Sequence, residues 1–95
     1  MKVQRQVPGG ARDAFLAQQR SMMNMAPKIS GLVFARQLWT KDQEQHLVVA
    51  RFQSRDAFEK LVDSKEYTEL MTKIPEEVKH IRTECFEVVS DVFPK

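Results

Sequence analysis

The sequence has few of the residues that mark several common classes of protein. It contains one cysteine, Cys85, and three glycines. A single cysteine cannot form an internal disulfide or a cysteine metal cluster, so the composition favours a reducing compartment. No apolar run approaches the roughly 18 residues that a transmembrane helix needs, and residues 1–30 lack the apolar core of a secretory signal. We therefore expect a cytoplasmic protein that makes no contact with a membrane.

An excess of charge of one sign is also missing. Fifteen basic and 13 acidic residues give a formal net charge of +2. The basic residues do not cluster with aromatic residues, which argues against a nucleic-acid partner. The two histidines, His46 and His80, lack the spacing of zinc ligands on a helix, and there is no glycine-rich phosphate loop. The sequence thus predicts neither a metal site nor a cofactor.

The sequence does contain a regular succession of strand and helix patterns. Apolar, β-branched runs bounded by Pro, Gly and polar residues predict strands, and apolar residues with a 3.6-residue period predict helices. Strands are expected over residues 1–7, 31–39 and 45–52, and within 79–92, centred on 83–89. Helices are expected over about 11–25 and in two segments between 54 and 75. A polar turn is expected over 40–44 and a tail at 94–95. This order predicts one α+β domain over residues 1–95. Its fold is ferredoxin-like (β-α-β-β-α-β), with a four-stranded antiparallel sheet and both helices on one face.

The expected second strand, GLVFARQLW (31–39), is apolar on both faces. Strict alternation places Leu32 and Phe34 on one face and Val33 and Ala35 on the other. The helices can cover only one face of the sheet, so we predict a homodimer in which two sheets pack face to face. Trp39, at the end of this strand, is assigned to the dimer interface because large aromatic residues are common interface anchors.

Three segments carry a resemblance to a known family. They are Ser30-Gly31-Leu32 at the entry to the second strand, HLVVARFQSRDAFEKLVDSKEY (46–67) and CFEVVSDV (85–92). In this order they resemble the dimeric α/β-barrel superfamily, most closely the antibiotic-biosynthesis monooxygenase type of domain. The resemblance implies a barrel formed by two sheets across a dimer, and a pocket between each sheet and its own helices.

Members of this family have different functions. They include cofactor-independent monooxygenases of polycyclic aromatic compounds, quinol monooxygenases, haem-degrading enzymes and proteins with no known activity, so the fold does not fix the function. In the haem-degrading branch an Asn, a Trp and a His act on or bind the haem. The matching positions here hold Gln4, Leu61 and Leu70. Because leucine cannot ligate iron, haem degradation is only the third hypothesis.

The expected pocket suits a small apolar, aromatic or quinone-like ligand. Its predicted substrate-binding residues are Gln4, Phe15, Met22, Phe58, Leu61 and Leu70. The catalytic candidates are Gln4, as a hydrogen-bonding group, and His46, as a general base at the pocket mouth. The structural interpretation of His46 is a partly exposed strand residue.

Other residues have structural interpretations. Cys85 is expected to be a small buried hydrophobe within the last strand. Arg36 and Arg51 are expected to form ion pairs with acidic residues of the last strand, namely Glu84, Glu87 or Asp91.

Two functional hypotheses remain open from the sequence. The first is a cofactor-independent monooxygenase acting on a small aromatic or quinol substrate. The second is a non-catalytic dimer of the same fold that binds a ligand or has a structural role, supported by the lack of an evident acid, base or ligand residue. The sequence does not decide whether the protein is an enzyme.

Overall fold

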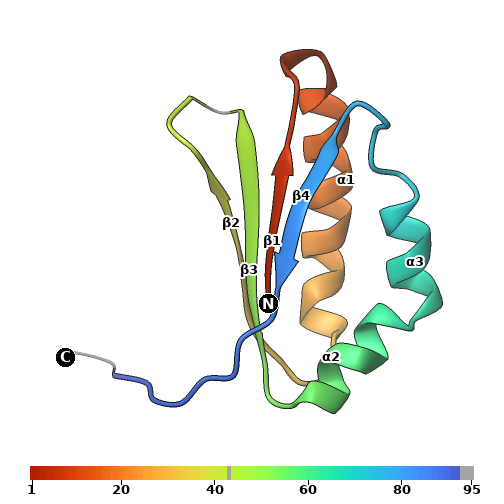
Figure 1. Ribbon diagram of the computed structural model, residues 1–95. Coiled ribbons are helices and arrows are strands. Elements are labelled where there is room, and N and C mark those ends of the chain that lie inside the picture. Colours follow the sequence, from red (N-terminus) through yellow and green to blue (C-terminus); the bar gives the residue numbers. More distant parts are fainter. Residues whose placement is uncertain (43, 93–95) are drawn as a thin grey trace.

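The computed structural model describes residues 1–42 and 44–92. Within them the chain forms β1 (Lys2–Gln6), η1 (Gly9–Ala11), α1 (Arg12–Met25), η2 (Ala26–Lys28), β2 (Leu32–Trp39), β3 (Gln45–Phe52), α2 (Arg55–Val62), α3 (Lys65–Met71) and β4 (Lys79–Glu84). The strands form an antiparallel sheet in the order β2-β3-β1-β4, and the helices pack against one face of it (Figure 1). The predicted α+β ferredoxin-like fold is confirmed. Residue 43 of the predicted turn and the predicted tail at 94–95 lie outside the described residues.

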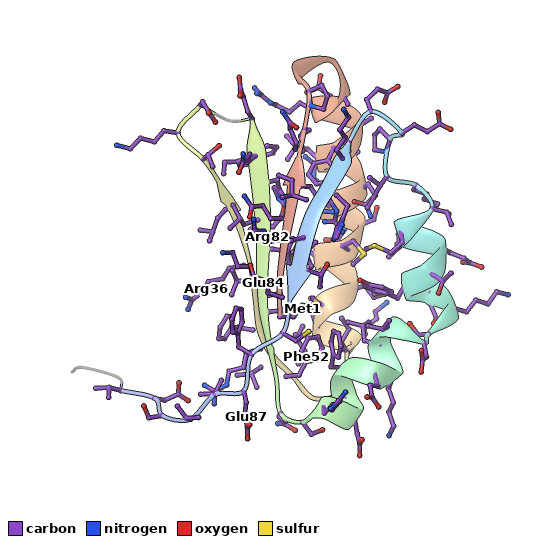
Figure 2. All side chains as sticks on the ribbon, viewed as in Figure 1. Met1, Arg36, Phe52, Arg82, Glu84 and Glu87 are labelled. Atoms are coloured by element: carbon purple, nitrogen blue, oxygen red, sulfur yellow. The ribbon has the colours of Figure 1, made fainter. Side chains whose placement is uncertain are left out.

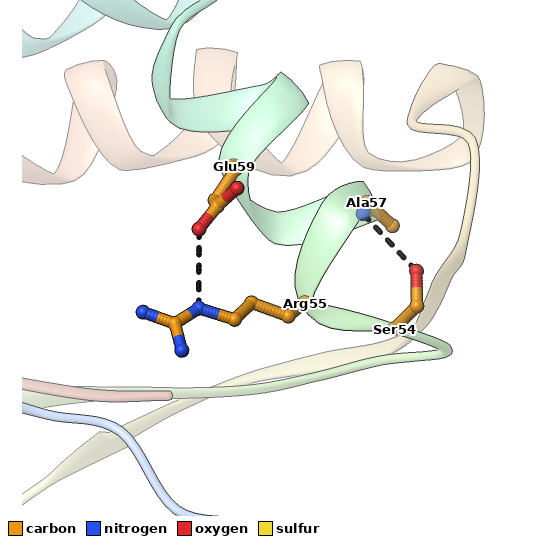
Figure 3. Close-up of polar contacts among 4 residues, drawn as sticks. All are labelled: Ser54, Arg55, Ala57 and Glu59. Carbon is orange, nitrogen blue, oxygen red and sulfur yellow. Dashed lines mark hydrogen bonds and ion pairs between the residues drawn. The ribbon is translucent and has the colours of Figure 1, made fainter.

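Local hydrogen bonds explain why the second helical region is divided into α2 and α3. The Ser54 hydroxyl caps α2 by accepting a hydrogen bond from the Ala57 amide at 3.2 Å (Figure 3). Ser64 caps α3 in the same way, through the Tyr67 amide at 3.2 Å. Each cap satisfies a backbone N–H that a helix start leaves unpaired, so each serine begins a new helix. The two helical segments expected between residues 54 and 75 are therefore α2 and α3.

Gly31 allows α2 to approach the start of β2 closely. Its φ angle is +82°, in the left-handed region, and a Cβ atom built on it would lie 2.5 Å from the Cβ atom of Ala57. Its carbonyl also accepts a hydrogen bond of 2.7 Å from the Gln53 amide. A residue with a side chain would meet both backbone strain and a steric clash here.

The substitution Gly31→Ala is therefore expected to lower the free energy of unfolding by about 2 kcal/mol. Urea denaturation followed by circular dichroism measures this loss. Gly10→Ala is the matched control, because a Cβ atom at Gly10 would meet nothing within 4 Å. Equal stability of the two variants would contradict the role given to Gly31.

The two faces of the sheet differ in what covers them. Val3 and Arg5 of β1 are buried beneath the helices, as are Val7, which follows β1, and His46 and Ala50 of β3. The register of β1 and β3 places Arg5 opposite His46. The other face is not covered by a helix, and we call it the open face. It carries alternate residues of β2 and β3, namely Phe34, Arg36, Leu38, Leu47, Val49 and Arg51.

The expected alternation along β2 is wrong at its start. The pairing with β3 shifts between Leu32, which lies opposite Phe52, and Phe34, which lies opposite Arg51. This irregularity places Leu32 on the helix-covered side while Phe34 lies on the open face. In Figure 2, Phe52 lies beside the helices and Arg36 lies on the side away from them. The irregularity inserts a residue into the period-two pattern, which sequence alternation cannot reveal.

The last strand is shorter than predicted. It ends at Glu84, and residues 85–92 extend away from the sheet without regular structure (Figure 1). β4 ends there because β1, the strand with which it pairs, has no further residues: Glu84 lies opposite Lys2, the first residue of β1. Cys85 is consequently exposed and not buried in a strand, and Val89 is 91% exposed.

The arginine predictions are confirmed for one residue of the two. Arg51 forms an ion pair with Asp91. Arg36 instead has its guanidinium 4.6 Å from the ring centroid of Phe34, on the open face. This arrangement is a cation–π contact between neighbours on one strand face.

Candidate functional site

A cavity of about 50 Å³ lies between the helix-covered side of the sheet and the helices. Strand residues such as Val3, Leu32, Ala35 and Ala50 form one wall of it. Residues from α1, η2, α2 and α3 form the opposite wall. The cavity lies where the predicted pocket was expected, between a sheet and its own helices.

Methionine side chains form a large part of the cavity lining. Four of the five methionines, Met1, Met22, Met23 and Met71, line the cavity. An apolar cavity of about 150 Å³ can hold a benzene ring, so a single ring would have to displace side chains here. Methionine is unbranched and has several rotatable bonds, which makes such a displacement inexpensive. The cavity can therefore enlarge around a flat ligand.

Arg5, Gln19 and Tyr67 are the polar lining residues within the described chain. Arg5 is only 7% exposed, and its Nη2 donates a hydrogen bond to Met71 Sδ at 3.8 Å. Burial lowers the pKa of Arg5 from its usual value, and the interaction with Tyr67 acts in the opposite direction. Burial raises the pKa of the Tyr67 phenol, and Arg5 opposes that shift. At neutral pH the site thus contains a cation and a protonated phenol, which can both donate hydrogen bonds.

Two buried glutamines fix α1 against α3 beside the cavity. The Gln19 Nε2 donates to Gln18 Oε1 at 2.6 Å, and the Gln18 Nε2 donates to the Leu70 carbonyl at 2.9 Å. Buried amides need such partners because an unpaired polar group costs stability. This chain of hydrogen bonds orients the Gln19 side chain at the cavity wall.

His46 lies in an aromatic cluster and does not line the cavity. Its ring is 0% exposed and lies 4.8 Å from the ring centroids of both Phe15 and Trp39. The His46 Nε2 is 2.9 Å from Gln37 Oε1, while its Nδ1 is buried with no hydrogen-bond partner in the described part of the chain. Burial and, secondarily, Arg5 lower the pKa of His46 to about 4. The interpretation of His46 as a partly exposed residue is wrong, because Phe15 and Trp39 cover it.

The structure brings two of the predicted substrate-binding residues together at the cavity, Met22 and Leu61. The other four lie elsewhere. Phe15 packs in the His46 cluster, and Phe58 packs on Phe52 with ring centroids 5.4 Å apart. The remaining two, Leu70 and Gln4, are not among the lining residues either.

Gln4 and Trp39 lie on the sides of the sheet opposite to those that their predicted roles require. Gln4 lies on the open face, where its Nε2 donates to Gln45 Oε1 at 2.6 Å. Trp39 lies on the helix-covered side, with the Arg12 guanidinium 5.7 Å from its ring centroid. Both placements follow from the register, since Gln4 pairs with Leu47 and Trp39 pairs with His46.

Sequence reasoning missed Arg5, Gln19 and Tyr67. A signal for Arg5 was present, because it alternates with Val3 and Val7 along β1 and so shares their buried face. A signal for Tyr67 was also present, because its spacing from Leu70 and Met71 places it on the apolar side of the same helix. Gln19 carries no sequence signal of burial.

Haem does not fit this site. The cavity is about 50 Å³, and no histidine or cysteine is among its lining residues. Leu70, at the position that matches the haem ligand, offers no donor atom. More generally, the described residues contain no group of three or more His, Cys, Asp or Glu side chains that could hold a metal ion.

Within the same described residues, no helix has the length and apolar character needed to cross a membrane.

Comparison with known proteins gives likenesses in structure only. No protein-family model and no curated protein sequence matches this chain. Rv0793 from Mycobacterium tuberculosis has a TM-score of 0.72 at 19% identity, over 94% of this chain and 96% of its own. SnoaB, a cofactor-independent oxygenase from Streptomyces nogalater, has a TM-score of 0.72 at 16% identity, over 94% and 95%.

A third solved structure shares the architecture. It is a dimeric ferredoxin-like protein of unknown function from Jannaschia sp. CCS1, with a TM-score of 0.64 at 12% identity over 90% of this chain and 100% of its own. At such identities the likeness shows the fold. It agrees with the ferredoxin-like fold that the sequence predicted.

Proposed function

We propose that this protein is a cofactor-independent monooxygenase-like protein that binds and oxygenates a small aromatic or quinol molecule in its sheet–helix cavity. The observation that carries the proposal is the cavity itself, an apolar site with a methionine wall and a few fixed polar groups. Such a combination is typical of small-molecule sites. The likeness in fold to SnoaB supports the reaction class.

The proposed chemistry needs little from the protein. An electron-rich quinol that has lost a proton can react with dioxygen directly. One oxygen atom enters the ring and the other leaves as water, because the quinol itself supplies the electrons and becomes a hydroxyquinone. The lining residues would exclude water from the ring and hold it in one orientation, and hydrogen-bond donors such as Tyr67 would stabilise the negative charge that develops.

One feature of the same cavity favours a second function, which is ligand binding without catalysis. Among the described residues, no carboxylate or imidazole lines it, so it lacks an evident general base. A non-catalytic protein that only binds a ligand of this shape would have the same lining. Oxygen consumption distinguishes the two functions, because binding alone consumes none.

Filling the cavity provides the test of ligand binding. We expect methylhydroquinone, a single-ring quinol, to bind the wild type, and Ala35→Leu to weaken the binding at least tenfold because the added side chain occupies the ring's space. Calorimetric titration measures the binding, and an oxygen electrode measures turnover. Val33→Leu is the matched control, since Val33 is on the same strand but 51% exposed and outside the lining.

Each outcome of this titration has a distinct meaning. Binding with oxygen uptake supports the monooxygenase, and binding without uptake supports the non-catalytic alternative. No binding to the wild type, or equal binding to Ala35→Leu, contradicts the proposed site.

We propose further that the protein is a homodimer through its open face. Phe34, Leu38, Leu47 and Val49 form an apolar group there, and Leu38 is 48% exposed. A second copy of the chain would cover this group in a symmetric interface. The Jannaschia protein of the same fold is described as dimeric, which supports this assembly.

A further inference from the structure

Arg5 is a buried cation without a counter-ion among the described residues. It has the one charged side chain among the residues described as lining the cavity. Four ion pairs join described residues, and none of them involves Arg5. Its hydrogen bond to the thioether of Met71 is a weak one, because thioether sulfur is a poor acceptor.

A buried positive charge lowers the stability of the folded chain unless a negative charge or hydrogen bonds compensate it. A guanidinium removed from water loses hydration energy, and buried charges in proteins are normally paired for this reason. The residues opposite Arg5 in the sheet are His46 on β3 and His80 on β4, and neither can supply a negative charge. In the helix layer, the groups near Arg5 are the Tyr67 phenol and the Met71 thioether, and both are electrically neutral. The protein leaves this cation facing an apolar cavity.

We propose that the cavity takes a single-ring aromatic ligand that bears an anionic oxygen, a carboxylate or an ionised phenol, and that Arg5 anchors this oxygen. The inference rests on the proposed function, since it names the substrate class of the same cavity. The fork of the guanidinium suits an oxyanion, and the Tyr67 hydroxyl can donate a further hydrogen bond to it. The apolar walls then hold the ring.

The anchor also fits the proposed reaction. If the oxyanion is an ionised phenol, it makes the ring electron-rich, whereas a carboxylate would only anchor the ring; in either case a cation at that oxygen favours the ionised form of the ligand. Arg5 would thereby promote ionisation of the ligand. This matters because no general base is among the described residues that line the cavity. Its role is to bind and stabilise charge, and it does not itself transfer a proton.

Matched pairs of neutral and anionic rings test the proposal. Benzoate is compared with benzamide, and 4-nitrophenol at pH 8.5, where it is ionised, with nitrobenzene. We expect the wild type to bind at least one anion ten or more times tighter than its neutral partner, and the pair with the larger ratio identifies the oxyanion. Arg5→Gln should abolish the preference while leaving neutral rings nearly unaffected. Arg36→Gln, on the open face, should keep the preference intact.

Two measurements keep the test decisive if Arg5→Gln fails to fold. Arg5→Lys retains the charge without the fork and should keep part of the preference. In the unmodified protein, the Nε–H signal of Arg5 in NMR spectra should shift with benzoate but not with benzamide.

Failure takes two distinguishable forms. Equal binding of anions and neutral rings, with methylhydroquinone still bound, overturns the anchor but leaves the proposed function standing. If no ring binds, methylhydroquinone included, both the anchor and the proposed site are wrong.

Discussion

Acidification from pH 6.5 to about pH 4 is expected to cost the protein on the order of 3 kcal/mol of stability through His46 alone. Burial holds the pKa of His46 at about 4 in the folded chain, against 6.5 for an ordinary histidine. In this window the unfolded chain takes up a proton that the folded chain does not. Unfolding therefore becomes more favourable as the pH falls, and the loss ends below about pH 4, where the folded chain is protonated as well.

Burial and the nearby Arg5 oppose the protonation of His46. Phe15 of α1 and Trp39 of β2 exclude water from the ring, and Arg5 of β1 and Arg12, which contacts Trp39, are cations. Gln37 is a neutral hydrogen-bond partner. With no carboxylate ion-paired to His46 in the described chain, nothing offsets the cost of a second positive charge beside Arg5.

Urea denaturation at pH 7 and at pH 4.5 measures the effect. His46→Gln retains a group that can hydrogen-bond to Gln37 but cannot ionise, so its stability should fall less between the two pH values. His80→Gln is the control, because His80 is exposed at the sheet edge. If wild type and His46→Gln lose the same stability, the buried neutral histidine is not responsible for the acid sensitivity.

Leu38→Lys is expected to convert the proposed homodimer into a monomer. In a symmetric interface the substitution occurs twice, and each new ammonium would be buried against an apolar surface. The open face already carries Arg36, Arg51 and Arg82, so like charges would oppose the contact further. We expect the dimer dissociation constant to rise by at least about a thousandfold.

Sedimentation velocity over a range of concentrations measures this change. Val62→Lys is the matched control, because Val62 is a comparably exposed apolar residue on α2, in the helix layer. The control should remain a dimer. A wild-type monomer at high concentration would contradict the homodimer, and a dimeric Leu38→Lys variant would place its interface elsewhere.

The sequence predicted the elements whose signals are local. Ser54 and Ser64 begin helices because their hydroxyls cap neighbouring amides, and the pattern around them is visible in the sequence. Runs of branched and aromatic apolar residues similarly located β2 and β3. Their order was enough to predict the ferredoxin-like topology.

Features that depend on pairing between distant strands were not predictable in this way. The early end of β4 follows from where β1 begins, and the facing of Leu32 follows from a register shift against β3. His46 was misplaced because its burial depends on Phe15, 31 positions away in the chain (46 − 15). The pocket was predicted in the right layer with Met22 and Leu61, but Phe15 and Phe58 were assigned to it although they do not line it, and Arg5 and three further methionines do.

The methionines allow a direct test of whether the cavity binds a small aromatic ligand. Four methionine methyl groups should lie at the cavity, while Met25 lies outside the lining and serves as an internal control. With ¹³C-methyl-labelled methionine, titration with methylhydroquinone should shift the signals of Met22, Met23 and Met71 and leave that of Met25 in place. No shift, or a shift of Met25 as large as the others, would contradict the proposed site.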